Sequence, residues 1–170
     1  QAAQVHGMLD PQAAADALFL LARYYRWPWL GVEANGPGLA TLVLLDQLGY
    51  PYLYRTKRLG QVGQPEMEKL GWVTDAHTRP LILSHLRRRL MLGQAGIRCS
   101  ETWDELASFV TEVNEKSGKV DYRAAPGARD DRVLSYAIAD YLNQTLPHLL
   151  PEDLARARDH VRDMGNPLSR

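Results

Sequence analysis

The sequence predicts an α/β fold in which helices alternate with the strands of a mixed sheet. Short apolar or alternating runs, which are typical of strands, stand between longer segments with the periodicity of amphipathic helices. Glycine and proline residues separate many of these segments. No repeat and no long linker divides the 170 residues, so we expect one domain over 1–170, with a core over 1–145 and a helical tail over 146–170.

The composition is that of a globular protein, with 45% hydrophobic and 24% charged residues. Because 20 basic residues balance 20 acidic ones, the chain is not a highly basic nucleic-acid-binding tail. Any contact with nucleic acid must come from local patches. The single cysteine, Cys99, excludes an internal disulfide framework and a cysteine-rich zinc module. No apolar run reaches the roughly 18 residues that a membrane span needs.

The clearest helix signals lie in the first third of the chain. Asp10 and Pro11 are typical of a helix start, where a carboxylate accepts backbone N–H groups and proline loses no hydrogen bond. This helix should end before Pro28. A second helix over 39–49 should close at Gly49, because glycine readily adopts the left-handed conformation that follows many helices. The apolar face of the first helix repeats at residues Ala14, Leu18 and Leu21 or Ala22.

The rest of the chain continues the alternation. Thr78 and Pro80 should begin a third helix, and the polar, glycine-rich stretch 57–74 predicts a loop or hairpin. Strands are expected at residues 30–34, 52–56 and 97–99, and a turn at 117–119 should lead into 120–124. Helices are expected at residues 101–113, with the apolar stripe Leu106, Phe109, Val110 and Val113, then at 133–142, and in the tail as far as Met164.

Glu33 is the first candidate for chemistry. It ends an apolar strand just before the turn Asn35-Gly36-Pro37-Gly38. A carboxylate in an apolar strand is costly unless it is paired or bound to a metal. An edge position facing solvent, or an arginine partner, would also explain it. The glycine-rich turn adds a reason for close approach of the backbone to a ligand.

The neighbouring carboxylates Asp130 and Asp131 are the second candidate. Mg²⁺ and Mn²⁺ prefer carboxylate oxygens, and a cation would offset the repulsion between two adjacent acids. An aspartate at a helix start also caps free N–H groups, so capping and metal binding both remain open. Helical spacing places Asp131 on the face of Leu134, Ser135 and Ile138, which we expect to point toward the sheet.

Two basic clusters could contact phosphates. Arg55, Lys57 and Arg58 follow one strand, and Arg87-Arg88-Arg89 lie late in a helix. A solvated face with compensation of the helix dipole is the simpler explanation of the second cluster. The five histidines form no i, i+4 pair typical of zinc sites, and a buried thiol is expected for Cys99. The chain has no phosphate-binding loop of the GxxxxGK[ST] type, so ATP hydrolysis is not expected.

The order of these motifs resembles the C-terminal nuclease domain of the large terminase subunit of tailed bacteriophages. No single motif is specific to that family, and the resemblance covers about residues 1–145. It rests on the order of residues 32–38, Leu48-Gly49-Tyr50 with 52–54, 71–74, 78–82, Glu105-Leu106 with Phe109-Val110, Gly118-Lys119, and 127–131 before an apolar helix.

The resemblance implies a ribonuclease H-like fold and a metal-dependent endonuclease that cuts concatemeric viral DNA during genome packaging. It implies two Mg²⁺ or Mn²⁺ ions, with Glu33, Asp130 and Asp131 as catalytic and metal-binding residues. Basic residues would offset the repulsion of DNA by the acids. We assign this role to Arg55, Lys57, Arg58 and Arg129.

The family resemblance also implies partners and a location. The substrate would be double-stranded DNA, and the partners would be an upstream ATPase domain, the small terminase subunit and the portal protein. The protein would act in the host bacterial cytoplasm during virion assembly.

Two features depart from the family pattern. The family often has a histidine before the aspartate pair, where this chain has Arg129. The family's first catalytic aspartate lies on a strand that would precede residue 1, and Asp10 does not replace it because it heads a helix. We therefore expect that the first strand or strands of the fold lie outside this sequence.

Two other functions remain open at this point. The chain could be a non-catalytic DNA-binding or docking module of a packaging motor. It could also be another ribonuclease H-like nuclease that acts on RNA–DNA hybrids or junction DNA. Cleavage by the metal-dependent endonuclease should show little sequence preference, because phosphate contacts carry no base information.

Overall fold

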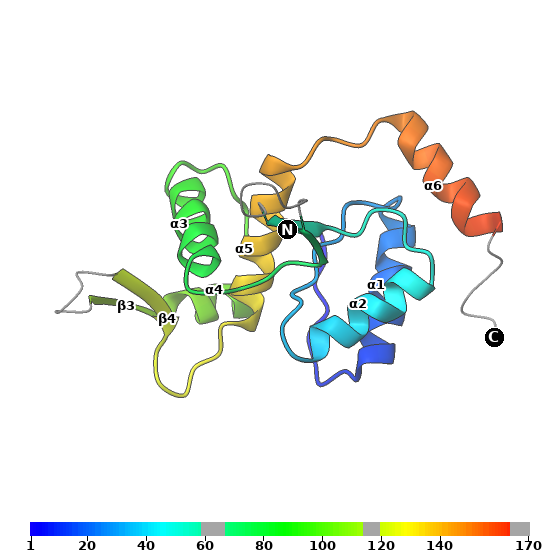
Figure 1. Ribbon diagram of the computed structural model, residues 1–170. Helices are drawn as coiled ribbons and strands as arrows, with labels where there is room; N and C mark the ends of the chain where they lie inside the picture. Colours follow the sequence, from blue (N-terminus) through cyan, green and yellow to red (C-terminus); the bar gives the residue numbers. More distant parts are fainter. Residues whose placement is uncertain (59–66, 114–119, 164–170) are drawn as a thin grey trace. The chain divides into compact units, whose positions relative to one another are not determined.

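The computed structural model describes residues 1–58, 67–113 and 120–163 and shows a mixed α/β protein (Figure 1). The described residues form six helices and two separate two-stranded antiparallel sheets, in place of one mixed sheet. The chain divides into two compact units. The first contains Gln1–His6 and Asp75–Thr145, and the second contains Gly7–Thr74 and Leu146–Arg170. The ribonuclease H-like fold and the single domain stay predictions.

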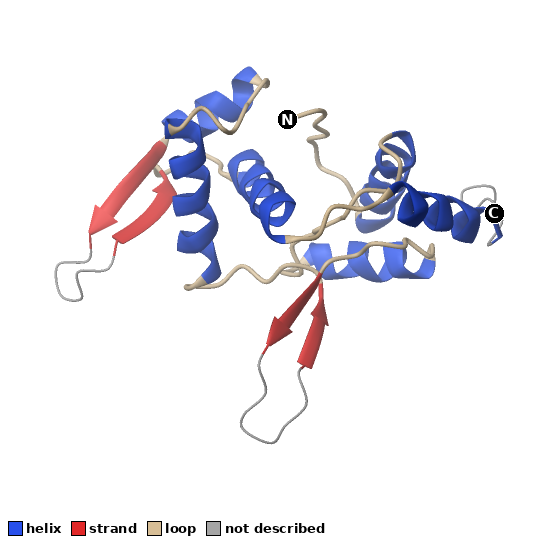
Figure 2. Ribbon diagram, turned by 90° about the horizontal axis from the view of Figure 1, so that it is seen from above, coloured by secondary structure: helices blue, strands red, loops and turns tan. Residues whose placement is uncertain are grey.

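The first unit is built around helix α5, Asp131–Thr145, which packs against α3, Thr78–Met91, and α4, Ser100–Ala107. A hairpin of β3, Phe109–Val113, and β4, Val120–Ala124, completes this unit (Figure 2). Apolar side chains on the facing sides of the helices form its core. They are Ile82, Leu83, Leu86, Val133, Leu134, Ala137, Ile138 and Leu142.

Two sequence predictions in the first unit are confirmed and two are wrong. The helices expected at Thr78 and at 133–142 are present. The strand expected at 97–99 is absent, since these residues form an irregular segment before α4. The helix expected over 101–113 ends at Ala107, because residues 109–113 pair with β4 instead. The turn expected at 117–119 lies outside the described residues.

The second unit contains helices α1, Pro11–Tyr24, α2, Pro37–Gln47, and α6, Pro151–Asp163. Helices α1 and α2 pack against each other, and a hairpin of β1, Arg55–Arg58, and β2, Met67–Leu70, accounts for the predicted loop or hairpin. Buried apolar residues join α1, α2 and α6. They are Ala15, Phe19, Ala22, Trp27, Leu42, Leu45, Tyr50, Leu53 and Ala157.

Helix α1 begins as the sequence predicts. The Asp10 carboxylate accepts a hydrogen bond from the Ala13 N–H at 2.9 Å. Its buried stripe differs from the prediction at two positions, because Ala15 and Phe19 are buried where Ala14 and Leu18 were expected. The helix ends at Tyr24, before Pro28 is reached.

Three short segments of the second unit pair in parallel. Leu30 bridges Leu53, and Glu33 bridges Trp72. The backbone hydrogen bonds of 30–34 come from Leu30, Val32 and Ala34, which share one edge of an extended chain. The opposite edge, at Gly31 and Glu33, has no backbone partner in the part of the chain that the structure describes.

None of the helices that the structure describes combines the length and the apolar character needed to cross a bilayer.

Candidate functional site

Glu33 lies near the carboxyl end of a short extended segment, where the sequence predicts a strand end, and this segment pairs in parallel with its neighbour. The Ala34 N–H donates to the Trp72 carbonyl at 2.6 Å, and the Trp72 N–H donates to the Val32 carbonyl at 2.8 Å. The Glu33 residue is half-buried. The Asn35 side-chain amide donates to Glu33 Oε1 at 3.4 Å and to the Thr74 carbonyl at 2.9 Å. Asn35 therefore ties the carboxylate to the end of the neighbouring segment.

The turn after Glu33 is closely packed against the chain itself. Gly36 has φ +56°, a conformation that glycine adopts without strain. Pro37 is the first residue of α2. A Cβ atom on Gly38 would lie 1.8 Å from the Glu33 carbonyl oxygen. The close approach that we expected toward a ligand is, at Gly38, an approach to the protein's own backbone.

Asp130 is paired with an arginine. Its carboxylate accepts a hydrogen bond from the Arg79 guanidinium, and the two side chains are 26% and 25% exposed. Arg79 Nε also donates to the Tyr122 carbonyl at 3.4 Å. The Asp130 carbonyl accepts from the Leu134 N–H at 2.8 Å, which places Asp130 immediately before α5. Arg79 thus places a positive charge beside the Asp130 carboxylate.

Asp131 is exposed, and the predicted orientation toward a sheet is wrong. Leu134 and Ile138 on the same helical face are buried, but Ser135 is exposed as well. The stripe that α5 buries begins at Val133, so the first turn buries Val133 and Leu134 while Asp131 faces solvent.

Glu105 has a structural role that the sequence analysis did not predict, since it named this residue only as part of the motif order. Its side chain is 8% exposed, and Oε1 accepts from the Arg132 guanidinium at 2.6 Å. Oε2 accepts from the backbone N–H groups of Arg132 and Val133, at 2.8 and 3.4 Å. This carboxylate from α4 therefore caps α5, a role that the sequence assigned to Asp130 or Asp131. The sequence signal for this capping role was an acidic residue on a helical face that is otherwise buried.

A second buried ion pair joins α3 to α5. Asp140 is 8% exposed at its side chain and lies 2.8 Å from Arg89 Nε. His85 Nε2 lies 3.5 Å from the same carboxylate. Arg89 also donates to the Gln94 carbonyl at 2.6 Å. Of the predicted triplet, Arg87 and Arg88 are exposed as expected, whereas Arg89 serves inside the first unit.

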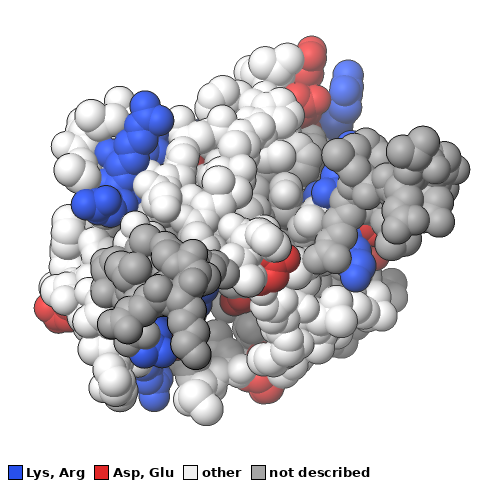
Figure 3. Space-filling view, turned by 60° about the vertical axis from the view of Figure 1, so that its left-hand side comes forward, with Lys and Arg blue, Asp and Glu red and all other residues white. Residues whose placement is uncertain are grey.

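The predicted phosphate-binding residues occupy different settings. Arg55 pairs with Asp46 at 3.2 Å, and Lys57 pairs with Glu68 across the β1–β2 hairpin at 3.5 Å. Arg129 is exposed, and the Arg58 backbone lies in β1. On the face drawn in Figure 3, lysine and arginine side chains show as separate small groups. Exposed ion pairs are worth about 0–1 kcal/mol, so these cations can exchange a carboxylate for a phosphate.

Two carboxylates, the exposed Glu101 and the half-buried Asp75, have lowered pKa values for local reasons. The Cys99 thiol donates to Glu101 at 2.9 Å, and with the Glu101 backbone N–H and the Ser100 hydroxyl it lowers the pKa of Glu101 to about 2. The backbone N–H groups of Thr78 and His77 lower the pKa of Asp75. Both carboxylates serve helix starts, and Cys99 is half-buried where a buried thiol was expected.

The acidic candidates are divided between the two units. Glu33 belongs to the second unit, whereas Asp130 and Asp131 belong to the first. Over residues 1–58, 67–113 and 120–163, no three His, Cys, Asp or Glu side chains gather as metal ligands would.

Comparison of the chain with protein-family models, with curated proteins and with solved structures found no match.

Proposed function

We propose that this chain is a metal-dependent endonuclease domain that hydrolyses phosphodiester bonds of DNA, with Glu33, Asp130 and Asp131 as its acidic residues. The observation that supports the proposal is the position of Glu33, a half-buried carboxylate at the carboxyl end of a parallel segment. In sheets with parallel strands, ligands bind beyond these ends. Mg²⁺ and Mn²⁺ bind carboxylate oxygens.

The motif order extends the proposal to a substrate and partners. Its resemblance to terminase nuclease domains favours concatemeric viral DNA as the substrate. The same resemblance favours an ATPase domain, the small terminase subunit and the portal protein as partners in the host cytoplasm. Arg55, Lys57, Arg58 and Arg129 would contact DNA phosphates, and Arg55 and Lys57 exchange weak surface ion pairs for these contacts.

Replacement of Glu33 by glutamine tests the nuclease proposal. The amide keeps the size of the side chain but removes the negative charge that would hold a cation. We expect Mn²⁺-dependent nicking of supercoiled plasmid to fall at least about 100-fold, because loss of a residue that only supports a metal ligand already costs about 10–100-fold. Thermal unfolding should change little, since among the residues that the structure describes this side chain has one polar contact, a 3.4 Å hydrogen bond from Asn35.

Glu152→Gln is the matched control, because Glu152 is an exposed acid of the same unit and lies in the first turn of α6. Its nicking rate should equal that of the unchanged chain. Equal rates for the Glu33 and Glu152 variants, or nicking that persists in EDTA, would contradict the proposal. Cleavage of RNA–DNA hybrid in preference to duplex DNA would move the substrate to the ribonuclease H alternative.

A non-catalytic DNA-binding module is the second candidate, and the Arg79–Asp130 pair favours it. A carboxylate neutralised by arginine is less available to a metal ion. In such a module, Asp130→Asn should free Arg79 and tighten DNA binding measured by electrophoretic mobility shift. In the nuclease, the same substitution should abolish cleavage. These two results separate the candidates with one variant.

A further inference from the structure

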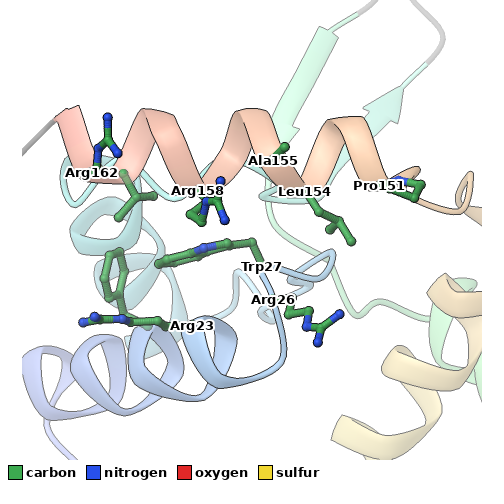
Figure 4. A pocket seen from close by; sticks show the side chains of 10 residues that line it. Arg23, Arg26, Trp27, Pro151, Leu154, Ala155, Arg158 and Arg162 are labelled. Atoms are coloured by element: carbon green, nitrogen blue, oxygen red, sulfur yellow. The ribbon is translucent and has the colours of Figure 1, made fainter.

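The second unit contains a large pocket between α1 and α6 that the proposed nuclease does not use (Figure 4). Its volume is about 820 Å³, which lies within the range of small-molecule sites. Both walls come from residues that the structure places within one unit. The lining residues are Phe19, Arg23, Arg26, Trp27, Pro151, Leu154, Ala155, Arg158, Val161 and Arg162.

Positive charge dominates this pocket. Its lining contains four arginines and, among the residues that the structure describes, no carboxylate. Arg23 and Arg162 lie in the last turns of their helices, where they also compensate helix dipoles. Arg26 lies beyond α1, and Arg158 lies within α6, so dipole compensation does not account for these two. Arginine binds phosphate through two parallel N–H bonds, which makes it the preferred phosphate ligand.

Aromatic and aliphatic groups form the inner surface of the same pocket. Trp27 and Phe19 are 6% and 2% exposed, and their rings pack edge to face with 5.0 Å between the ring centroids. Figure 4 shows the Trp27 ring between helix α6 and the Arg23 side chain. Leu154 and Val161 add aliphatic surface from α6. A flat aromatic group can pack against such a surface while an attached anion contacts the arginines.

The backbone at the end of α1, which carries two of the lining residues, has an unusual conformation. Arg26 and Trp27 have φ values of 63° and 58°, although neither is glycine. The Trp27 N–H donates to the Ala22 carbonyl at 2.7 Å, and the Arg26 N–H donates to the Arg23 carbonyl at 3.3 Å. These two bonds are the Schellman motif, in which glycine usually occupies the position of Arg26. Strained residues of this kind cluster at ligand sites.

We propose that this pocket binds a small phosphate ester with an aromatic body, the chemical class of the nucleoside phosphates. The four arginines recognise the phosphate, and the half-buried Leu154 and Val161, with the exposed edge of Trp27, take the ring. Arg26 occupies a position where glycine would relieve backbone strain, and it keeps a guanidinium at the rim of the pocket. The site is separate from Glu33, Asp130 and Asp131, and it does not depend on the nuclease proposal.

Isothermal titration of the full chain with AMP tests the proposal. The experiment is run in EDTA, which removes any contribution of divalent metal ions and so of a nuclease site. AMP should bind at least about 10-fold more tightly than adenosine or inorganic phosphate, because each lacks one of the two recognised groups. No binding of AMP, or binding of phosphate as tight as that of AMP, would overturn the proposal.

Arg158→Ala and Arg156→Ala form a matched pair of variants. The two side chains are 75% and 76% exposed, and each pairs with an aspartate, at 3.7 and 3.6 Å. Only Arg158 lines the pocket. We expect Arg158→Ala to weaken AMP binding about 10-fold and Arg156→Ala to change it less than about 2-fold. Equal effects of the two substitutions would show general charge attraction and overturn the site.

Arg26→Gly separates the ligand role from a structural one. Glycine relieves the left-handed strain, so the melting temperature should rise by about 2–4 °C. AMP binding should fall about 10-fold, because the guanidinium is lost. A variant that gains stability and keeps full affinity would show that Arg26 does not contact the ligand.

Discussion

Replacing Glu105 by alanine is expected to destabilise the protein by about 3 kcal/mol. The substitution removes the carboxylate that pairs with Arg132 and accepts two backbone N–H groups at the start of α5. Arg132 is only 20% exposed at its side chain, so its charge would lose its partner in a largely buried position. The loss of the helix cap adds to this cost. Urea unfolding followed by circular dichroism measures the change.

Asp104→Ala is the control for this prediction. Asp104 is the preceding residue of α4 but is exposed, so its replacement should change the free energy of unfolding by less than about 0.5 kcal/mol. Glu105→Gln should fall between the two, because the amide oxygen still accepts a hydrogen bond but the charge is gone. Equal unfolding midpoints for Glu105→Ala and Asp104→Ala would show that the cap does not stabilise α5.

Helix starts were the most predictable part of the fold, because their signals are local. Asp10 with Pro11, and Thr78 with Pro80, lie at or next to the first residues of α1 and α3. Gly49 follows α2 with φ +70°, as a glycine after a helix should.

Errors arose where distant segments decide the structure. Residues 109–113 carry Phe109, Val110 and Val113, whose spacing fits a helical stripe. In the structure they pair with residues 120–124 instead, and the high β propensity of Phe and Val favours that pairing. Periodicity within one segment carries no information about a partner strand. The same limit applies to 97–99, where the expected strand has no partner among the described residues.

The roles of the carboxylates also depend on residues that are distant in the sequence. Glu105 and Asp140 are buried because Arg132 and Arg89, far away in the sequence, supply their charge. The sequence indicated helical faces but not which arginine would reach which acid. Asp130 is a further example. Its local sequence suited either a helix cap or a metal ligand, but the structure pairs it with Arg79, which is distant in the sequence. Glu33 was predictable in position because the strand end and the turn are encoded next to each other.

Gly38→Ala is expected to destabilise the protein by about 2–3 kcal/mol, the cost of overpacking a filled site. In an ordinary helix this substitution would stabilise by roughly 1 kcal/mol, because alanine has the higher helix propensity. Here the new Cβ would lie 1.8 Å from the Glu33 carbonyl oxygen and 3.1 Å from its carbonyl carbon. A backbone atom has no rotamer with which to move away, so the turn between Glu33 and α2 must shift. Urea unfolding gives the sign of the change directly.

Gly7→Ala distinguishes this clash from a general effect of alanine. A Cβ on Gly7 would meet nothing within 4 Å, and Gly7 belongs to the same unit. Its unfolding free energy should stay the same or rise by up to about 1 kcal/mol. Because the shift at Gly38 moves the backbone of Glu33, the Gly38 variant should also lose Mn²⁺-dependent nicking under conditions where it remains folded. A stable Gly38→Ala protein with unchanged nicking would mean that the turn does not position the carboxylate.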